Sequence, residues 1–272
     1  MNTTSWNYEL ARTWEKFLPP IRPYQEEIEI FRALIYKYLQ TSEDHPNVLI
    51  LGSTPELRDL VCSLGLVPTV VDYSKENYVA MGTLKKTRNT TERFVESDWL
   101  EFESDESFDI ILSEAALNVV DARSSAIMYR RCSDLLKSGG YLLAKNWIRV
   151  ANGSYSVEDL IASYRTASNY PFGFYSYSCI PLMLCFYDYD GEVIYLREFS
   201  KRCRELFEAN LITQREWESI AVHKYENVDL QLYIPSQADF RRDIEKYFVI
   251  EKIYDIETAF SEFHPIFALS RR

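Results

Sequence analysis

The 272-residue sequence contains few of the residues on which several classes of protein depend. Its five cysteines are an odd number with no Cys-x-x-Cys pair, so we expect reduced thiols rather than a disulfide framework. It has three histidines and no metal-ligand cluster with the usual spacing, so we expect no metal site. Among its eight glycines there is no Gly-x-Gly-x-x-Gly motif, which disfavours an NAD(P)-dependent oxidoreductase.

An excess of basic residues and long apolar runs are also absent. With 30 Lys and Arg against 41 Asp and Glu, the formal net charge is −11, and such a surface repels the phosphates of nucleic acids. The first residues do not read as a signal peptide, and no apolar run is long enough to span a membrane. We therefore expect a cytoplasmic protein that binds neither nucleic acid nor membrane, while a homodimer remains open.

Apolar and aromatic side chains are abundant. The hydrophobic fraction is 47%, which is enough for a chain of this length to bury a sizeable core. The 20 Tyr, 15 Phe and 5 Trp favour an aromatic-rich core, with an aromatic-lined pocket as the alternative.

Short apolar segments alternate with helical patterns through the first half of the chain. Buried strands are expected at 47–51, 68–72, 93–98, 108–113 and 141–146, and helices at 26–39, 55–64, 74–87 and 124–136. Such alternation predicts a doubly wound, mostly parallel sheet with helices on both faces. Ligands of such sheets bind beyond the carboxyl ends of the strands, which locates the expected site.

Residues 151–235 interrupt this alternation and are expected to form an inserted cap. They combine a helix at 157–166, an aromatic stretch at 172–189 and helices that begin near Glu198 and Thr213. A helix at 236–248 and strands at 249–256 and 264–270 follow. Because only a short loop joins these last two strands, we expect them to be antiparallel.

Two features mark the carboxyl ends of the first strands. The first strand ends at Gly52, where a missing side chain lets a ligand approach the backbone. Ser53 or Thr54 can cap the following helix, and Glu56 stands three residues after Ser53, at capping-box spacing. A well-formed turn between strand and helix explains this segment as well as a ligand site does.

Acidic residues end the next two strands. Asp72 lies twenty residues beyond Gly52, where a carboxylate can accept both hydroxyls of a ribose. Asp98 ends the third strand, is followed by Trp99, and can accept an exocyclic amino group of adenine. Either acid alone reads as a solvated loop residue, but two on consecutive strand ends beside a glycine turn indicate a nucleoside site.

These segments together resemble the class I S-adenosylmethionine-dependent methyltransferases. Residues 51–57 (LGSTPEL) are similar to an LGxTPEL form of the first motif, Asp72 matches the acid of the second, and 97–99 match the third. Residues 108–118 resemble the fourth-strand motif, 135–140 the turn before the fifth strand, and 18–23 a proline-arginine segment that often precedes this domain. The sequence departs from the common pattern because the first motif has one glycine where many members have three.

The resemblance implies a single Rossmann-like α/β domain over residues 1–272, with an antiparallel C-terminal strand. A helical lid would occupy 1–44, the core 45–150 and 236–272, and the cap 151–235. It implies S-adenosylmethionine as the cofactor and S-adenosylhomocysteine as its product. The residues expected to bind the cofactor are Gly52, Ser53, Thr54, Glu56, Asp72, Tyr73, Asp98, Trp99, Ser113, Glu114, Ala115 and Leu117.

Methyl transfer depends mainly on holding the acceptor in line, and a general base helps only if the nucleophile arrives protonated. Glu114, just past the fourth strand, is the preferred base, with His264 and His223 as alternatives. The lid and cap are expected to form the acceptor pocket. Its candidate residues are Arg22, Tyr24, Trp147, Tyr175 and Tyr177, with Phe172, Phe174, Phe186 and Tyr187 as further cap aromatics.

The predicted function is methyl transfer to a small-molecule or peptide acceptor by in-line displacement. Oxygen, nitrogen and carbon acceptors remain open at this stage. A catalytically inactive methyltransferase-like binding or scaffold protein is the alternative, and an NAD(P)-dependent oxidoreductase is a weaker one.

Overall fold

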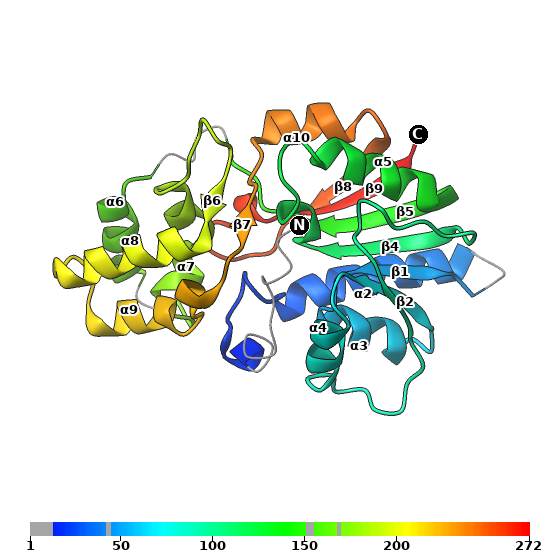
Figure 1. The fold of residues 1–272 in the computed structure, drawn as a ribbon, viewed down its shortest axis with the longest axis horizontal. Helices are drawn as coiled ribbons and strands as arrows, with labels where there is room; N and C mark the ends of the chain where they lie inside the picture. Colours follow the sequence, from blue (N-terminus) through cyan, green and yellow to red (C-terminus); the bar gives the residue numbers. More distant parts are fainter. Residues whose placement is uncertain (1–12, 42–44, 151–154, 168–169) are drawn as a thin grey trace.

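The computed structural model describes residues 13–41, 45–150, 155–167 and 170–272 (Figure 1). Parts of the predicted lid (1–12 and 42–44) and of the predicted cap (151–154 and 168–169) lie outside the described residues. None of the helices within the described ranges is long and apolar enough to cross a membrane.

The core is a seven-stranded sheet with the order β3-β2-β1-β4-β5-β9-β8. Its strands are β1 (Val48–Leu51), β2 (Pro68–Asp72), β3 (Arg93–Glu96), β4 (Phe108–Glu114), β5 (Leu136–Lys145), β8 (Phe248–Tyr254) and β9 (Ile266–Arg271). The first five run parallel, and β9 runs antiparallel to both β5 and β8. This topology confirms the predicted Rossmann-like fold with its antiparallel C-terminal strand.

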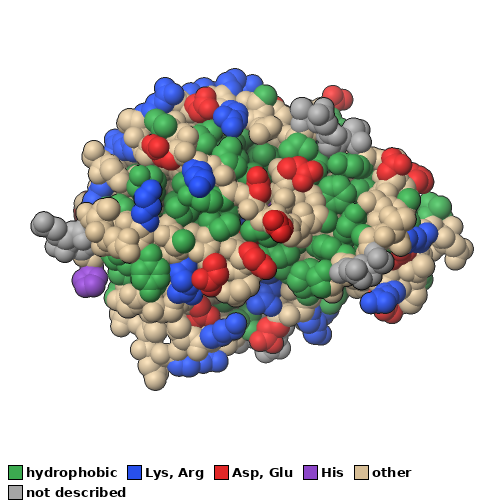
Figure 2. Space-filling view, turned by 180° about the vertical axis from the view of Figure 1, so that it is seen from behind, with side chains coloured by type: hydrophobic (Ala, Val, Ile, Leu, Met, Phe, Trp, Pro, Cys, Tyr) green, Lys and Arg blue, Asp and Glu red, His purple; other side chains and the backbone are tan. Residues whose placement is uncertain are grey.

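Helices cover both faces of the sheet because each buries one apolar stripe. The helices are α2 (Gln25–Thr41), α3 (Pro55–Ser63), α4 (Lys75–Gly82), α5 (Ser125–Leu135) and α10 (Gln237–Ile244). On one face α2 packs Ile28, Phe31 and Ile35 against β1, with α3 and α4 beside it (Figure 1). On the other face α5 and α10 pack together. The described acids gather over the middle of the view from behind, with Lys and Arg scattered around them (Figure 2).

Several elements differ from the prediction. Helix α4 ends at Gly82 instead of residue 87, and α7 (Phe174–Leu184) occupies much of the stretch predicted only as aromatic. Strand β5 begins at Leu136, so the predicted Gly139-Gly140 turn belongs to the strand. Its backbone passes so close to β4 that a Cβ on Gly140 would lie 2.8 Å from the carbonyl oxygen of Asp109. Gly140 therefore permits the close approach of β5 to β4.

The inserted segment forms a helical cap at one end of the sheet (Figure 1). It consists of α6 (Val157–Thr166), α7, β6 (Ile194–Tyr195), α8 (Leu196–Glu208), α9 (Gln214–Ala221) and β7 (Gln231–Leu232). The predicted capping box of Thr213 and Glu216 is present at the start of α9. The cap has its own apolar core, in which Phe174, Phe199 and Cys203 are fully buried. We call residues 225–235, which lead from the cap back to α10, the return segment.

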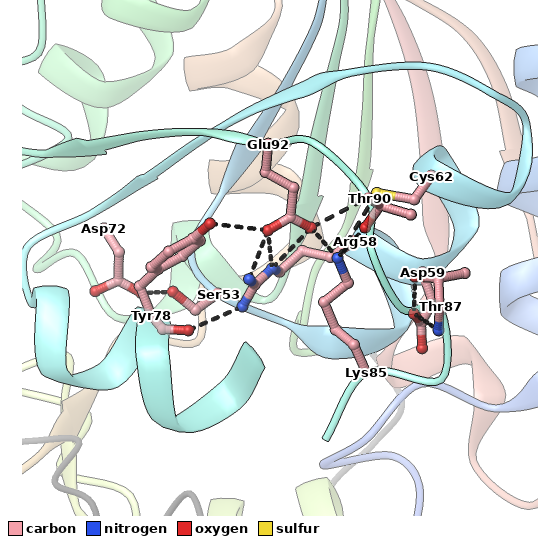
Figure 3. A network of polar contacts seen from close by, with 10 residues as sticks. All are labelled: Ser53, Arg58, Asp59, Cys62, Asp72, Tyr78, Lys85, Thr87, Thr90 and Glu92. Atoms are coloured by element: carbon pink, nitrogen blue, oxygen red, sulfur yellow. Dashed lines mark hydrogen bonds and ion pairs between the residues drawn. The ribbon is translucent and has the colours of Figure 1, made fainter. Parts of the chain in front are cut away.

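A buried ionic network joins α3, α4 and the start of β3 (Figure 3). The carboxylate of Glu92 accepts hydrogen bonds from Arg58 Nη2 at 2.6 Å and Tyr78 Oη at 3.0 Å, and it pairs with Lys85. The side chains of Arg58 and Glu92 are only 3% and 4% exposed. Burial opposes the charged carboxylate, but the hydrogen bonds from Arg58 and Lys85 outweigh it and hold the pKa of Glu92 at about 2.

Replacing Glu92 by Gln removes the negative charge that faces the buried cations Arg58 and Lys85. We therefore expect a loss of about 3–5 kcal/mol in the free energy of unfolding. Because the pKa of Glu92 is lowered on folding, its contribution is present above the ordinary carboxylate range and fades as the pH falls toward 2. Urea unfolding at pH 7 and pH 3 measures both effects. Glu106→Gln, which breaks an exposed pair with Arg93, is the control and should cost less than about 1 kcal/mol. Equal losses in the two variants would contradict this account.

Candidate active site

A cavity of about 580 Å³ opens beyond the carboxyl ends of β1, β2 and β4, as the sheet topology predicts. One part of its wall comes from the core, where Leu51–Thr54 and Asp72–Tyr73 follow the first two strands. The opposite part comes from the cap and the return segment, through Tyr195, Tyr225 and residues 229–232. Its volume lies within the ~300–1,000 Å³ range of small-molecule sites.

Gly52 lines this cavity directly after β1. Its φ angle of +89° is in the left-handed region that favours glycine, and an added Cβ would lie 3.4 Å from the ring of Trp99. Trp99 is fixed there because its Nε1 donates a 2.8 Å hydrogen bond to the carbonyl oxygen of Val71. Glycine and indole together form a flat, apolar part of the wall.

Asp72 is the buried acid of the core side (Figure 3). Its Oδ2 accepts hydrogen bonds from Ser53 Oγ at 2.6 Å and Asn77 Nδ2 at 2.9 Å, and its Oδ1 accepts one from the Ser74 amide at 3.1 Å. These bonds favour the charged form, but burial prevails and raises the pKa of Asp72. A carboxylate has about four acceptor positions, so capacity remains for one more donor from the cavity.

The expected capping of α3 by Ser53 or Thr54 is wrong. Thr54 occupies the N-cap position without a side-chain cap hydrogen bond, and Ser53 turns its hydroxyl to Asp72. Glu56, expected to contact the cofactor, does not line the cavity. Its carboxylate instead accepts hydrogen bonds from Arg22 Nη2 at 2.6 Å and from Trp14 Nε1 at 3.2 Å. Glu56 thus anchors the N-terminal segment (residues 13–24). These contacts take the place of the capping box predicted between Ser53 and Glu56.

The other predicted cofactor residues divide into two groups. Those that line the cavity are Gly52, Ser53, Thr54, Asp72, Tyr73, Trp99, Glu114 and Ala115. Asp98, Ser113 and Leu117 do not line it. Asp98 uses its Oδ1 to accept the Leu100 amide, so it shapes the turn that presents Trp99. Its predicted contact with adenine stays a prediction.

Glu114, at the end of β4, lies beside a fully buried ammonium group. Lys145 Nζ is 3.2 Å from Glu114 Oε1, 2.9 Å from Glu27 Oε2 and 2.9 Å from the carbonyl oxygen of Pro20. Burial raises the pKa of Glu114 to about 7, although the Lys145 charge opposes this. In the same cluster the pKa of Glu27 is lowered: burial opposes this, but Lys145 and the hydrogen bond from His264 outweigh it. Glu114 is therefore the carboxylate able to exchange a proton near neutral pH.

The two histidines proposed as alternative bases lie outside the cavity lining. His223 is buried against the rings of Phe17 and Tyr175, and burial lowers its pKa to about 3. His264 Nδ1 lies 3.2 Å from Glu27 Oε1 behind the site. Of the three candidate bases, only Glu114 lines the cavity.

Among the predicted acceptor residues, Trp147 lines the cavity. Arg22, Tyr24, Tyr175 and Tyr177 do not line it, and neither do the further cap aromatics Phe172, Phe174, Phe186 and Tyr187. Tyr175 lies one layer behind the wall, where its hydroxyl donates to Tyr225 Oη at 3.2 Å. The cap aromatics mainly pack against one another and against the N-terminal segment.

Sequence reasoning missed several lining residues, including Asn77, Asn118, Tyr195, Tyr225 and Asp229. Asn118 joins three segments, since its Nδ2 donates to the carbonyl oxygens of Trp147 and Tyr233 and its Oδ1 accepts from the Trp147 amide, all at 2.9 Å. One signal was available for the return segment. It lies between two predicted helices, one of the cap and one of the core, so it must lead from the cap back to the core.

Comparisons with known proteins agree with this geometry. Residues 53–144, about a third of the chain, match the family model described as "Methyltransferase domain". The CcbJ methyltransferase from Streptomyces caelestis is 10% identical, with 100% of this chain and 99% of that chain covered and a TM-score of 0.62. An S-adenosylmethionine-dependent methyltransferase from Clostridium acetobutylicum is 13% identical, with 97% and 98% covered and a TM-score of 0.55.

A third solved structure, the glycopeptide N-methyltransferase MtfA complexed with S-adenosyl-L-homocysteine, is 11% identical, with 89% and 90% covered and a TM-score of 0.51. At these identities the structures show a shared fold alone. No curated protein matches the sequence. Residues 53–144 thus match a methyltransferase domain, and the chain shares the fold of S-adenosylmethionine-dependent methyltransferases.

Gly52→Ala tests the role of the glycine against Trp99. We expect the positive φ to cost about 1–2 kcal/mol of stability, and the methyl group added beside Trp99 to weaken binding of S-adenosylhomocysteine severalfold. Gly65→Ala is the matched control, because Gly65 also has a positive φ of +75° but has open space around its Cβ. Thermal unfolding and calorimetric titration of both variants separate the two effects. Unchanged ligand affinity in Gly52→Ala would remove Gly52 from the binding site.

Proposed function

We propose that the chain binds S-adenosylmethionine across the core side of the cavity and transfers its methyl group to an acceptor held under the cap. The observation that carries this proposal is the joint placement of Gly52, Trp99 and Asp72 at one cavity wall. Asp72 would accept one ribose hydroxyl, and the Gly52–Trp99 surface would lie against the nucleoside. Asn77 Oδ1, which is buried and has no hydrogen-bond partner within the described residues, adds an acceptor at the same wall.

When bound, S-adenosylmethionine supplies a methyl carbon on a positively charged sulfur, and transfer forms the acceptor–carbon bond while the electrons of the carbon–sulfur bond stay on sulfur. The chain's part is to align and desolvate the acceptor. Glu114 lies where β4 meets the acceptor side, and it can take up the proton of a protonated nucleophile. Lys145 holds the Glu114 carboxylate and the N-terminal segment together, because its ammonium contacts Glu114 and the Pro20 carbonyl.

The cavity and its covering cap favour a small molecule or a short peptide group as the acceptor. The strand ends are covered by the return segment and by Trp14 and Ile21 of the N-terminal segment. This cover leaves limited room beside a bound cofactor. The net charge of −11 argues against a nucleic-acid acceptor. An inactive binding protein would share the cofactor site, so turnover is the measurement that separates the two hypotheses.

Asp72→Ala should weaken binding of S-adenosylmethionine and S-adenosylhomocysteine at least about tenfold, because a hydrogen bond to a charged group contributes about 1.5–3 kcal/mol. Isothermal titration calorimetry measures this, with NAD as a ligand that should not bind. Asp105→Ala, a change at an exposed loop acid, is the control that should bind as the parent does. Asp72→Asn keeps the size of the side chain, so it shows whether a loss of binding in Asp72→Ala comes from misfolding. Parent-like affinity in both Asp72 variants would refute the ribose role.

Glu114→Gln should lower kcat/KM about 100-fold for an acceptor that arrives protonated, since general bases contribute roughly 10²–10⁴-fold. In the parent, kcat/KM should rise with pH through about 7, as Glu114 loses its proton. Lys145→Met removes the positive charge that opposes protonation of Glu114, and it should move that rise to higher pH. The rate of S-adenosylhomocysteine formation, measured across a range of pH in the parent and both variants, tests this. Glu208→Gln, at an exposed acid, is the control. A pH profile that is identical in Glu114→Gln and the parent would exclude Glu114 as the base.

A further inference from the structure

The cavity lining beyond Gly52, Trp99 and Asp72 is built mainly from apolar side chains. We call this part of the lining the acceptor side, and it consists of residues between 114 and 124, Trp147, Tyr195, Leu196, Tyr225 and 229–232. Its larger aliphatic members come from the core, the cap and the return segment, and they are Val119, Val120, Leu196, Leu230 and Leu232. Such a surface gains free energy by covering the hydrocarbon part of a ligand, roughly in proportion to the area buried.

Aromatic rings add to this surface. Trp147 and Tyr225 both line the cavity. The hydroxyl of Tyr225 accepts a hydrogen bond at 3.2 Å from Tyr175, which lies behind the wall. Because that hydroxyl is engaged within the protein, Tyr225 contributes ring surface to the lining. Rings of this kind pack well against a flat apolar ligand.

The charged groups of the acceptor side provide no unpaired partner for an ionised acceptor. No Lys, Arg or His is among the described residues that line the cavity, so an anionic acceptor would meet no counter-charge there. Of the acids, Glu114 is paired with Lys145 at 3.2 Å, and Asp121 accepts backbone amide hydrogen bonds from its own turn. Asp229 is likewise not free. Because burying an ionised group without a partner is costly, this side favours a neutral acceptor.

The indole N–H of Trp147 is a buried donor that the protein itself does not use. The side chain is 5% exposed, and its Nε1 has no hydrogen-bond partner within the described parts of the chain. The side-chain amide of Asn118 holds the Trp147 backbone, because it donates to the carbonyl oxygen and accepts from the amide N–H, both at 2.9 Å. A buried N–H without a partner costs free energy, and an oxygen or nitrogen atom of a ligand can satisfy it.

We propose that the methyl acceptor is a neutral, largely apolar ring compound with an oxygen or nitrogen atom that accepts a hydrogen bond from Trp147 Nε1. This substrate class rests on the proposed function, because the acceptor shares the cavity with the cofactor. The aliphatic and aromatic residues hold the apolar body, and the indole N–H sets its orientation. Carboxylates and phosphates are disfavoured because they would bury an unpaired charge, and peptides because they bring more polar groups than this side can satisfy.

Ligand-observed NMR on the protein saturated with S-adenosylhomocysteine tests the proposal. The probes are phenyl alkyl ketones, together with the alkylbenzenes and the carboxylates of the same skeleton. Capped dipeptides of similar size are a further set. We expect the ketones to bind, and the carboxylates and dipeptides to bind at least about tenfold more weakly.

Trp147→Phe tests the indole N–H, because it keeps an aromatic ring and removes the donor. The ratio of ketone affinity to alkylbenzene affinity should fall about fivefold, which corresponds to one neutral hydrogen bond. S-adenosylhomocysteine should bind as it does to the parent, which shows that the variant is folded. Trp217→Phe is the matched control, since Trp217 stacks on Phe207 in the cap outside the cavity lining, and it should leave the ratio unchanged.

The outcomes separate this substrate class from the proposed function. If S-adenosylhomocysteine binds but no neutral ring compound binds, or carboxylates or dipeptides bind as well as the ketones, the acceptor class is wrong and the cofactor proposal stands. An affinity ratio that is unchanged in Trp147→Phe, or that falls equally in Trp217→Phe, also overturns it. If S-adenosylhomocysteine itself does not bind, the proposed function fails and the acceptor class fails with it.

Discussion

The buried ammonium of Lys145 is the interaction on which the site depends. It ends β5, is paired in register with Glu114 of β4, and contacts Glu27 of α2 and the Pro20 carbonyl. A buried cation is tolerated only where such partners surround it, so its position dictates where the N-terminal segment crosses the sheet. Ile21, the next residue after Pro20, thereby lines the cavity.

The same ammonium contacts two carboxylates whose pKa values are shifted in opposite directions. Glu27 has additional partners, because its Oε2 accepts the Tyr24 amide at 2.9 Å and its Oε1 faces His264. Glu114 has fewer contacts and borders the cavity, so burial affects its ionisation more. The charge therefore rests on Glu27, and the exchangeable proton belongs to Glu114. One lysine thus holds Glu27 in a buried ion pair and also contacts Glu114, which borders the cavity.

Local patterns explain why much of the fold could be predicted from sequence. The apolar runs 48–51 and 68–71, which are followed by Gly52 and Asp72, identify two strands and their carboxyl ends, and these ends meet because the strands are parallel. Asp72 and Gly52 were thus placed at one wall by topology alone. Glu56 was misassigned for the converse reason: its partner Arg22 is 34 residues away, and no local spacing reveals it.

The acceptor side was beyond sequence reasoning because composition does not distinguish aromatics in a core from aromatics in a pocket. Tyr175 and Tyr225 are both buried and hydrogen-bonded to each other, yet only Tyr225 lines the cavity. What decides between them is how the return segment is held to the core. Asn118 fixes that position because its one side-chain amide donates to the carbonyl oxygens of Trp147 and Tyr233, so a core residue holds the return segment against the cavity.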